Sequence, residues 1–316
     1  MRRTRRSPAA LVRFAAQTAV LWGVLPLLGV SPSGCSKGGE DAAKPGKAAR
    51  TIIQSKGSDT MVNVAQAWAE AYQKVDSGVE VEVSGGGSGV GIAALIRGTV
   101  NIANASRNMK PQELESARKN TGKEPKEFVV GYDALAIFVH KDNPLEEITL
   151  DRIAQIYAEG GAITKWSDLG VKLPSGQDEI IRISRQSSSG TYEFLREHVL
   201  KDKDFKLGSR DLNGSKEVVE LVANTPGAIG YSGMGYATKG VKMLKVAEKA
   251  GVQACAPCVE NALDKSYPIA RSLLVYTLGE PQGATKKYID WTMSDAGQKI
   301  VEESGYVPIP AGSRTK

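Results

Sequence analysis

Short strands that end in loops of glycine and serine, each followed by a helix, recur along this chain and constrain its fold more than any other feature. Strands are predicted at Thr51–Ser55, Val79–Val83 and Val100–Ala103. The helix after the first strand has apolar residues at helical spacing, namely Val62, Ala65, Trp68, Ala69 and Tyr72. Three successive strands, each followed by a loop and a helix, predict a parallel sheet covered by helices.

The same order returns in the second half of the chain. A continuous apolar strand of the buried type is expected over Ala134–His140, and a further strand over Ile180–Ser184 leads through a serine-rich loop to a helix over Tyr192–Leu200. A last long helix is expected over Thr285–Glu303. The folded part of about 265 residues exceeds the usual size of a single hydrophobic core, so the sequence predicts two α/β lobes.

The N-terminal 34 residues carry five arginines and no acidic residue, and an apolar run of 17 residues from Phe14 to Val30 precedes small residues up to Cys35. This order of charged, apolar and small segments predicts a secretory signal peptide over residues 1–34. A membrane-spanning helix is the alternative, because a run of this length lies at the lower limit of what crosses a bilayer. We therefore expect an exported protein, in the periplasm or at the cell surface.

The segment Ser33-Gly34-Cys35 resembles a bacterial lipobox, in which the cysteine becomes the lipid-modified first residue of the mature protein. Pro32 stands where such motifs usually have leucine. The resemblance implies lipidation at Cys35 and a membrane anchor. Residues 35–50 are rich in glycine, alanine and lysine and lack apolar periodicity, which predicts a flexible linker between this anchor and the folded part.

The basic character of the chain lies largely in its first segment. The whole chain has a net charge of +6, and since five of its arginines precede Cys35, the charge of residues 35–316 is only +1. A nearly neutral mature chain gives no electrostatic reason to expect a nucleic-acid partner.

Cys255 and Cys258 form a C-x-x-C pair, for which a local disulfide is predicted because the protein is expected to be exported. A redox motif would stand at the start of an apolar-periodic helix, and none follows Pro257. A metal site would need at least two more ligands, while His140 and His198 lie in unrelated contexts. No metal or other cofactor is therefore expected.

Four strand-to-helix junctions combine glycine with hydroxyl residues, which is the composition of an anion site. The candidate residues are Gly57, Ser58, Ser88, Ser106, Ser189, Gly190 and Thr191. Helix N-termini carry unpaired N–H groups, glycine allows close approach to the backbone, and hydroxyls add donors. Each serine alone could simply cap a helix. Four such junctions at the carboxyl ends of parallel strands, where ligands bind α/β sheets, favour a shared anion site.

Two of these junctions also contain an arginine, Arg107 and Arg185. The planar guanidinium matches two oxygens of a tetrahedral oxyanion, although a surface ion pair is the alternative for each. Asp59 lies in the first junction, where it could accept a proton from a ligand or act only as an acidic residue in the first turn of a helix.

The runs SKGSDTM, SGGGSGVGIAALIRGTVNIANASRNM, SRQSSSGT, GAIGYSGMGYA and YPIARSLLVYT stand in the same order as in a known family. They resemble the phosphate-binding protein of the bacterial high-affinity phosphate ABC importer, over about Thr51–Pro310. The resemblance implies a type II periplasmic-binding-protein fold, in which two lobes, each a sheet flanked by helices, are joined by a two-crossover hinge. The crossovers are expected near residues 131–133 and 231–235, with residues 51–132 and 235–316 in lobe 1 and residues 133–234 in lobe 2.

The resemblance implies that Gly57, Ser58, Thr60, Ser88, Ser106 and Arg107 bind phosphate from lobe 1, and that Arg185, Ser189, Gly190 and Thr191 bind it from lobe 2. Some family members have an aspartate where Arg107 stands, and that carboxylate accepts the proton of hydrogen phosphate and so excludes sulfate. Its replacement here leaves the choice between phosphate and other oxyanions open.

The function implied is that of a monomeric solute-binding protein that delivers inorganic phosphate to membrane permease subunits and is not an enzyme. Binding of sulfate or molybdate is an alternative within the same class. A secreted phosphatase is an alternative of another class, but it would need an activating base or metal beside a loop serine, and neither histidine lies in such a motif. A structural or adhesive surface protein would leave the clustered serine, glycine and arginine unexplained.

Overall fold

The structure is a computed structural model that describes residues 50–314. The predicted signal peptide, the lipidation site Cys35 and nearly all of the predicted linker lie outside the described residues.

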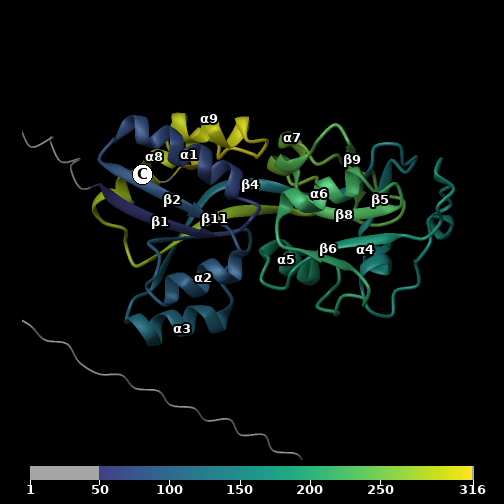
Figure 1. The fold of residues 1–316 in the computed structure, drawn as a ribbon, viewed down its shortest axis with the longest axis horizontal. Helices are drawn as coiled ribbons and strands as arrows, with labels where there is room; N and C mark the ends of the chain where they lie inside the picture. Colours follow the sequence, from purple (N-terminus) through teal and green to yellow (C-terminus); the bar gives the residue numbers. More distant parts are fainter. Residues whose placement is uncertain (1–49, 315–316) are drawn as a thin grey trace, which may run out of the picture. The chain divides into compact units, whose positions relative to one another are not determined.

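The strands alternate with helices along most of the described chain, as the sequence predicted (Figure 1). The strands are β1 (Thr51–Gly57), β2 (Val79–Ser84), β3 (Ile102–Ala105), β4 (Pro125–His140), β5 (Glu147–Thr149), β6 (Ile181–Arg185), β7 (Arg210–Leu212), β8 (Ala228–Gly233), β9 (Val241–Met243), β10 (Lys245–Ala247) and β11 (Ala270–Leu278). The α-helices are α1 (Val62–Val75), α2 (Ser88–Ile96), α3 (Pro111–Thr121), α4 (Leu150–Tyr157), α5 (Gly190–His198), α6 (Ser215–Ala223), α7 (Val259–Leu263), α8 (Gly283–Thr292) and α9 (Asp295–Glu303). Short 3-10 helices are η1 (Trp166–Leu169), η2 (Met234–Tyr236) and η3 (Ala311–Ser313).

In lobe 1 the strand order is β2-β1-β3-β11-β4. The first three strands are parallel, as predicted, whereas β11 is antiparallel to both of its neighbours. Helices α1, α8 and α9 lie on one face of this sheet and α2 and α3 on the other (Figure 1). Trp68 of α1 is buried against the first face, so the apolar residues that predicted this helix are the ones that face the sheet.

In lobe 2 the strand order is β4-β8-β6-β7, with β9 also paired to β4. Strand β6 is parallel to β7 and β8, and β8 is antiparallel to β4. Helix α6 packs on one face, and α4, α5 and α7 contribute to the core on the other. The two-lobed α/β fold expected from the sequence is thus confirmed.

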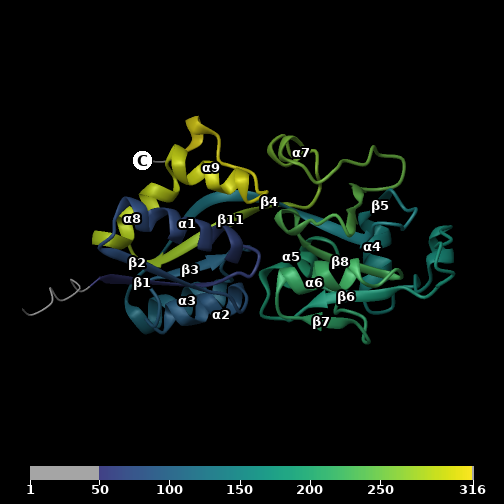
Figure 2. The same cartoon turned by 45° about the horizontal axis from the view of Figure 1, so that its top comes forward.

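Strand β4 belongs to both lobes. Its residues up to Ala134 pair with β11, and from Leu135 onward they pair with β8. Figure 2 shows β4 passing from the lobe 1 helices to those of lobe 2. The first crossover therefore lies in a continuous strand, directly after the predicted residues 131–133.

The second crossover differs from the prediction. Residues 241–247 form β9 and β10, which pair with β4 and β5 of lobe 2. Tyr267 and Ile269 are buried in the same core, and the Tyr267 hydroxyl donates to the Leu135 carbonyl oxygen at 2.7 Å. The chain therefore returns to lobe 1 near Ile269–Arg271 rather than near residues 231–235. Strands β9 and β10 have only three residues each, which is too few for a recognisable periodicity. The sequence therefore does not reveal that this segment belongs to lobe 2.

Two further expectations differ from the structure. The predicted helix over Thr285–Glu303 is divided into α8 and α9, because Ser294 caps α9 by accepting from the Gly297 N–H. Cys255 and Cys258 are free thiols rather than the predicted disulfide. Cys255 is held in a backbone bridge to Val246, while Cys258 is the residue directly before α7.

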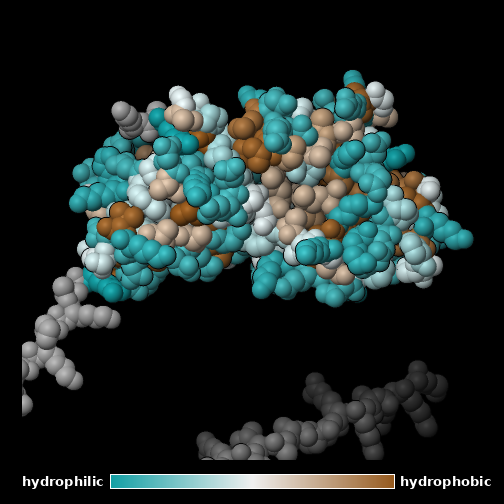
Figure 3. All heavy atoms as spheres, turned by 90° about the horizontal axis from the view of Figure 1, so that it is seen from above, coloured by the Kyte–Doolittle hydropathy of each residue, from teal (hydrophilic) through white to brown (hydrophobic). Residues whose placement is uncertain are grey.

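The face seen in Figure 3 is mostly hydrophilic, and it is hollowed where the two halves of the folded part meet. Between residues 50 and 314 no helix combines the length and the apolar composition needed to span a bilayer. Over the same residues, no group of three histidine, cysteine or acidic side chains is arranged to hold a metal ion.

Candidate functional site

The serines of the three lobe 1 junctions lie together. The Ser58 and Ser106 Oγ atoms are 2.9 Å apart, and Ser88 Oγ lies 3.4 Å from Ser106 Oγ and accepts from the Ser106 N–H at 3.1 Å. Each of the three residues is at most 2% exposed. They meet because β1, β2 and β3 are parallel and so end at one edge of the sheet.

Gly57 sets the position of the first junction. Its φ of +146° lies outside the usual range of residues with a side chain, and a Cβ there would lie 2.1 Å from the Asn104 carbonyl oxygen. The neighbouring Ser58 N–H donates to that same oxygen at 2.8 Å. The glycine therefore allows β1 to end close enough to β3 for Ser58 and Ser106 to meet.

The N-termini of two helices from different lobes face each other at this cluster. Ser88 begins α2 in lobe 1 and Gly190 begins α5 in lobe 2. A Cβ on Gly190 would lie 2.3 Å from Ser88 Oγ and 2.7 Å from Ser106 Oγ. Since the first turn of a helix leaves N–H groups unpaired and carries partial positive charge, two such ends together favour an anion.

Thr60 and Thr191 join the lobes beside the same cluster. Their Oγ1 atoms are 2.9 Å apart, and both residues are at most 1% exposed. The adjacent Ser189 caps α5 by accepting from the Thr191 N–H at 3.1 Å, so its side chain has the capping role that was the alternative for each junction. Gly89 N–H and Ser188 O add a further contact between the lobes, at 3.0 Å.

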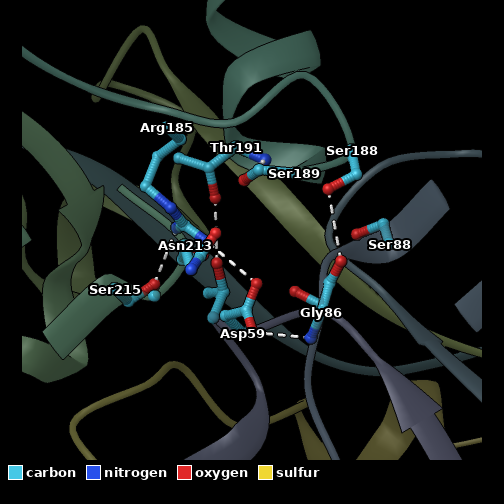
Figure 4. A network of polar contacts seen from close by, with 12 residues as sticks. Asp59, Gly86, Ser88, Arg185, Ser188, Ser189, Thr191, Asn213 and Ser215 are labelled. Atoms are coloured by element: carbon cyan, nitrogen blue, oxygen red, sulfur yellow. Dashed lines mark hydrogen bonds and ion pairs between the residues drawn. The ribbon is translucent and has the colours of Figure 1, made fainter. Parts of the chain in front are cut away.

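Arg185 and Asp59 form an ion pair across the lobes (Figure 4). Arg185 Nη2 lies 2.9 Å from Asp59 Oδ2, and Asp59 Oδ1 accepts from the Gly86 N–H at 2.8 Å. The guanidinium also donates to Ser215 Oγ at 3.0 Å and to the Asn213 carbonyl oxygen at 2.7 Å. Burial lowers the pKa of Arg185 and the Asp59 charge opposes that shift. An arginine remains protonated under such conditions, so the site keeps this positive charge.

Arg107 lies beside the start of α2, since a Cβ on Gly89 would be 3.6 Å from its Nη2 atom, and its guanidinium is paired with Glu113. Its Nη1 and Nη2 atoms each lie 2.8 Å from an oxygen of Glu113, and Nη1 also donates to the Asn108 carbonyl oxygen. Glu113 in turn accepts from the Lys110 N–H at the start of α3. The ion-pair alternative for Arg107 is thus present in the structure, while its role as a phosphate ligand stays a prediction.

The Arg107–Glu113 pair leads to a stability prediction. Burial alone would raise the pKa of Glu113, but hydrogen bonds from Arg107 and Lys110 outweigh it and hold that pKa below its ordinary value. Its contribution to folding is thus present at neutral pH and is lost as the pH falls through the folded-state pKa. We expect Glu113→Gln to cost about 2 kcal/mol at pH 7, or about 4–8 °C in melting temperature. Calorimetry should show this loss shrinking once the pH falls below the ordinary pKa of a glutamate, and a loss that stays constant there would contradict the prediction.

The prediction from the sequence missed several residues of the network. Asn213 and Ser215, which bind Arg185, follow the short strand β7 and carry no periodic signal. Asp133 and Arg271 form a second buried ion pair, with Arg271 Nη2 2.8 Å from Asp133 Oδ2. From the sequence, Asp133 was expected only at the first crossover, and Arg271 was noted only within the run YPIARSLLVYT.

These features define a class of protein, in which two α/β lobes joined by crossover strands hold polar groups from both lobes together where the lobes meet. A family model described as the PBP superfamily domain matches residues 42–296. The phosphate-binding protein PstS of Pseudomonas aeruginosa is 34% identical over 269 residues, which are 82% of this chain and 83% of that protein.

Solved structures agree with this comparison. A protein of Clostridium perfringens described as a phosphate ABC transporter substrate-binding protein, with bound phosphate, has a TM-score of 0.72 and 31% identity, over 82% of this chain and 100% of its own. An ABC-type phosphate transport receptor of Vibrio cholerae has a TM-score of 0.64 and 27% identity, over 82% of this chain and 100% of its own. The chain therefore belongs to the PBP superfamily and, within it, to the family of bacterial phosphate-binding proteins.

Proposed function

We propose that this protein is the extracytoplasmic solute-binding component of a phosphate ABC importer. It captures inorganic phosphate between its lobes and delivers it to the membrane permease subunits. The observation that carries this function is the meeting of donors from both lobes, where Gly190 at the start of α5 contacts the Ser88 and Ser106 hydroxyls. Related proteins with 34% and 31% identity are named for binding or transporting phosphate.

Binding proceeds by exchange of hydrogen-bond partners. Hydroxyls that bond one another, such as those of Ser58 and Ser106, turn towards the oxygens of the ligand and replace its hydration shell. We propose a ligand set made up of Gly57, Ser58, Thr60, Ser88 and Ser106 from lobe 1 and Arg185, Ser189, Gly190 and Thr191 from lobe 2. Because the donors are divided between lobes, each lobe binds better when the other is engaged, and the ligand favours closure.

Asp59 provides an acceptor among these donors. Its carboxylate is close to Arg185 and 13% exposed at the side chain. Hydrogen phosphate can donate its proton to a carboxylate, whereas sulfate at neutral pH has no proton and is repelled. Asp59 thus fills the role of the aspartate that some family members have where Arg107 stands, which favours phosphate over sulfate and molybdate.

Parallel titrations of residues 51–316 test this function. After removal of bound ligand, we expect isothermal titration at pH 7.5 to detect phosphate binding and no sulfate or molybdate binding. In Asp59→Asn the difference between phosphate and sulfate should shrink by about tenfold or more, because a hydrogen-bonded charge contributes roughly 1.5–3 kcal/mol. Tighter binding of sulfate or molybdate than of phosphate would contradict phosphate as the proposed ligand. Turnover of a phosphomonoester would contradict the assignment as a binding protein.

The export route is part of the same proposal. The arginine-rich apolar segment up to Gly34 acts as a signal peptide, and Cys35 receives the lipid that holds a monomeric protein at the membrane. This position allows the loaded lobes to reach the permease. Mass spectrometry of the protein from a membrane fraction tests the anchor, since a lipidated N-terminal Cys35 is expected and an unmodified one would contradict it.

A further inference from the structure

Arg271 and Asp133 form a buried ion pair at the hinge. The two residues are direct partners in the antiparallel pairing of β11 with β4, the two strands that connect the lobes. Arg271 Nε and Nη2 lie 2.9 and 2.8 Å from Asp133 Oδ2, while Asp133 Oδ1 accepts from the Met234 N–H at 3.0 Å. The side chains are 2% and 0% exposed, so solvent screens this pair little.

The same guanidinium reaches the proposed ligand set. Arg271 Nη2 donates to Thr60 Oγ1 at 3.2 Å, and its Cζ atom lies 5.5 Å from the ring centroid of Phe194 in α5 of lobe 2. Thr60 is held from its other side, because its carbonyl oxygen accepts from the Tyr306 hydroxyl. Arg271 therefore contacts the hinge, the first ligand loop of lobe 1 and the ligand helix of lobe 2.

The contact with Arg271 restricts the Thr60 hydroxyl. A guanidinium can only donate hydrogen bonds, so Thr60 Oγ1 accepts from Arg271 and its own proton must point elsewhere. Thr191 Oγ1 is 2.9 Å away, and either hydroxyl can be the donor of that hydrogen bond. In both arrangements one of the two hydroxyl protons is not used within the pair and is left to donate to the ligand.

We propose that Arg271 is a positioning residue that makes the Thr60–Thr191 pair a donor of hydrogen bonds towards the ligand. This inference rests on the proposed function and deepens it. Without the guanidinium, the Thr60 hydroxyl can rotate and present its lone pairs to the cleft, which an ionised phosphate oxygen repels. Arg271 thus selects ionised oxygens at this position without contacting the ligand itself, and Asp133 keeps the guanidinium in place.

A double-mutant cycle tests the proposal. We expect Arg271→Met to raise the Kd for phosphate by about tenfold or more, since it removes a charge-assisted hydrogen bond. In a Thr60→Val background, which has no hydroxyl to orient, Arg271→Met should change the Kd by less than about threefold. An equal loss in both backgrounds would show that Arg271 acts through the hinge alone and would overturn the inference, as would unchanged affinity of Arg271→Met.

Two controls separate this outcome from others. Tyr267→Phe removes a buried hinge hydrogen bond at Leu135 without touching Thr60, so it should lower the melting temperature and leave the Kd unchanged. If Arg271→Met does not fold, Thr60→Ser and Thr60→Val carry the test, and the serine variant should bind at least about fivefold more tightly. Equal binding by these two variants would overturn the inference, whereas absence of phosphate binding by the unmodified protein would overturn the proposed function itself.

Discussion

Replacing Arg185 with methionine is expected to weaken phosphate binding by at least about 100-fold. The guanidinium is 1% exposed and is the ion-pair partner of Asp59, so its loss removes charge-assisted donors and leaves a carboxylate facing the ligand. Both effects act in the same direction, because the unpaired Asp59 repels the anion. Isothermal titration with phosphate measures the change directly.

The matched control for this variant is Arg182→Gln. Arg182 lies on the same strand, β6, but its Nη2 donates to the Leu207 carbonyl oxygen, away from the hydroxyl cluster. We expect this variant to bind phosphate as the unmodified protein does. If the Kd of Arg185→Met for phosphate stayed within about tenfold of that of the unmodified protein, Arg185 would only join the lobes through Asp59 and would not be a phosphate ligand.

Replacing Gly190 with alanine is expected to weaken phosphate binding by about 50-fold while leaving the fold intact. The added Cβ would lie 2.3 Å from Ser88 Oγ and 3.0 Å from Ser88 Cβ, so α5 could not approach α2. Within lobe 2 the substitution is tolerated, because Gly190 is the first residue of α5 and its φ is not positive. The Gly190→Ala variant is therefore expected to prevent closure of the lobes without unfolding them.

Gly312→Ala is the control, since a Cβ at that position meets no atom within 4 Å. Small-angle scattering in excess phosphate should show Gly190→Ala remaining expanded while Gly312→Ala becomes compact. A Gly190→Ala protein that closes and binds phosphate normally would mean that the helix N-termini separate in the loaded state, contrary to the proposed ligand set.

The local parts of the site followed from the sequence. The strand, loop and helix pattern around Ser58 and Ser88 is set by periodicity and turn residues within about ten positions, so it can be recognised without a tertiary structure. The position of these loops at one edge of the sheet also followed, because parallel strands end together. Arg185, Gly190 and Thr191 come from one such junction, between β6 and α5, and their role as phosphate ligands stays a prediction.

Contacts between distant segments did not follow from the sequence. Arg107 and Arg185 stand in similar loops, yet one is neutralised by Glu113 of its own lobe and the other meets Asp59 across the cleft. Local sequence preferences cannot tell which carboxylate each arginine will meet, because the partner of a long side chain depends on how the helices and strands pack.

The sequence by itself determined the two α/β lobes and the glycine and hydroxyl loops, since these depend on local periodicity and backbone preference. Only the tertiary structure decided the second crossover and the contacts of Arg271. Strand β11 lies antiparallel between β3 and β4, and this strand order places Arg271 opposite Asp133 and within reach of Thr60. The physical reason is that strand order and lobe contacts are set by burial of whole surfaces, which no short window of sequence specifies.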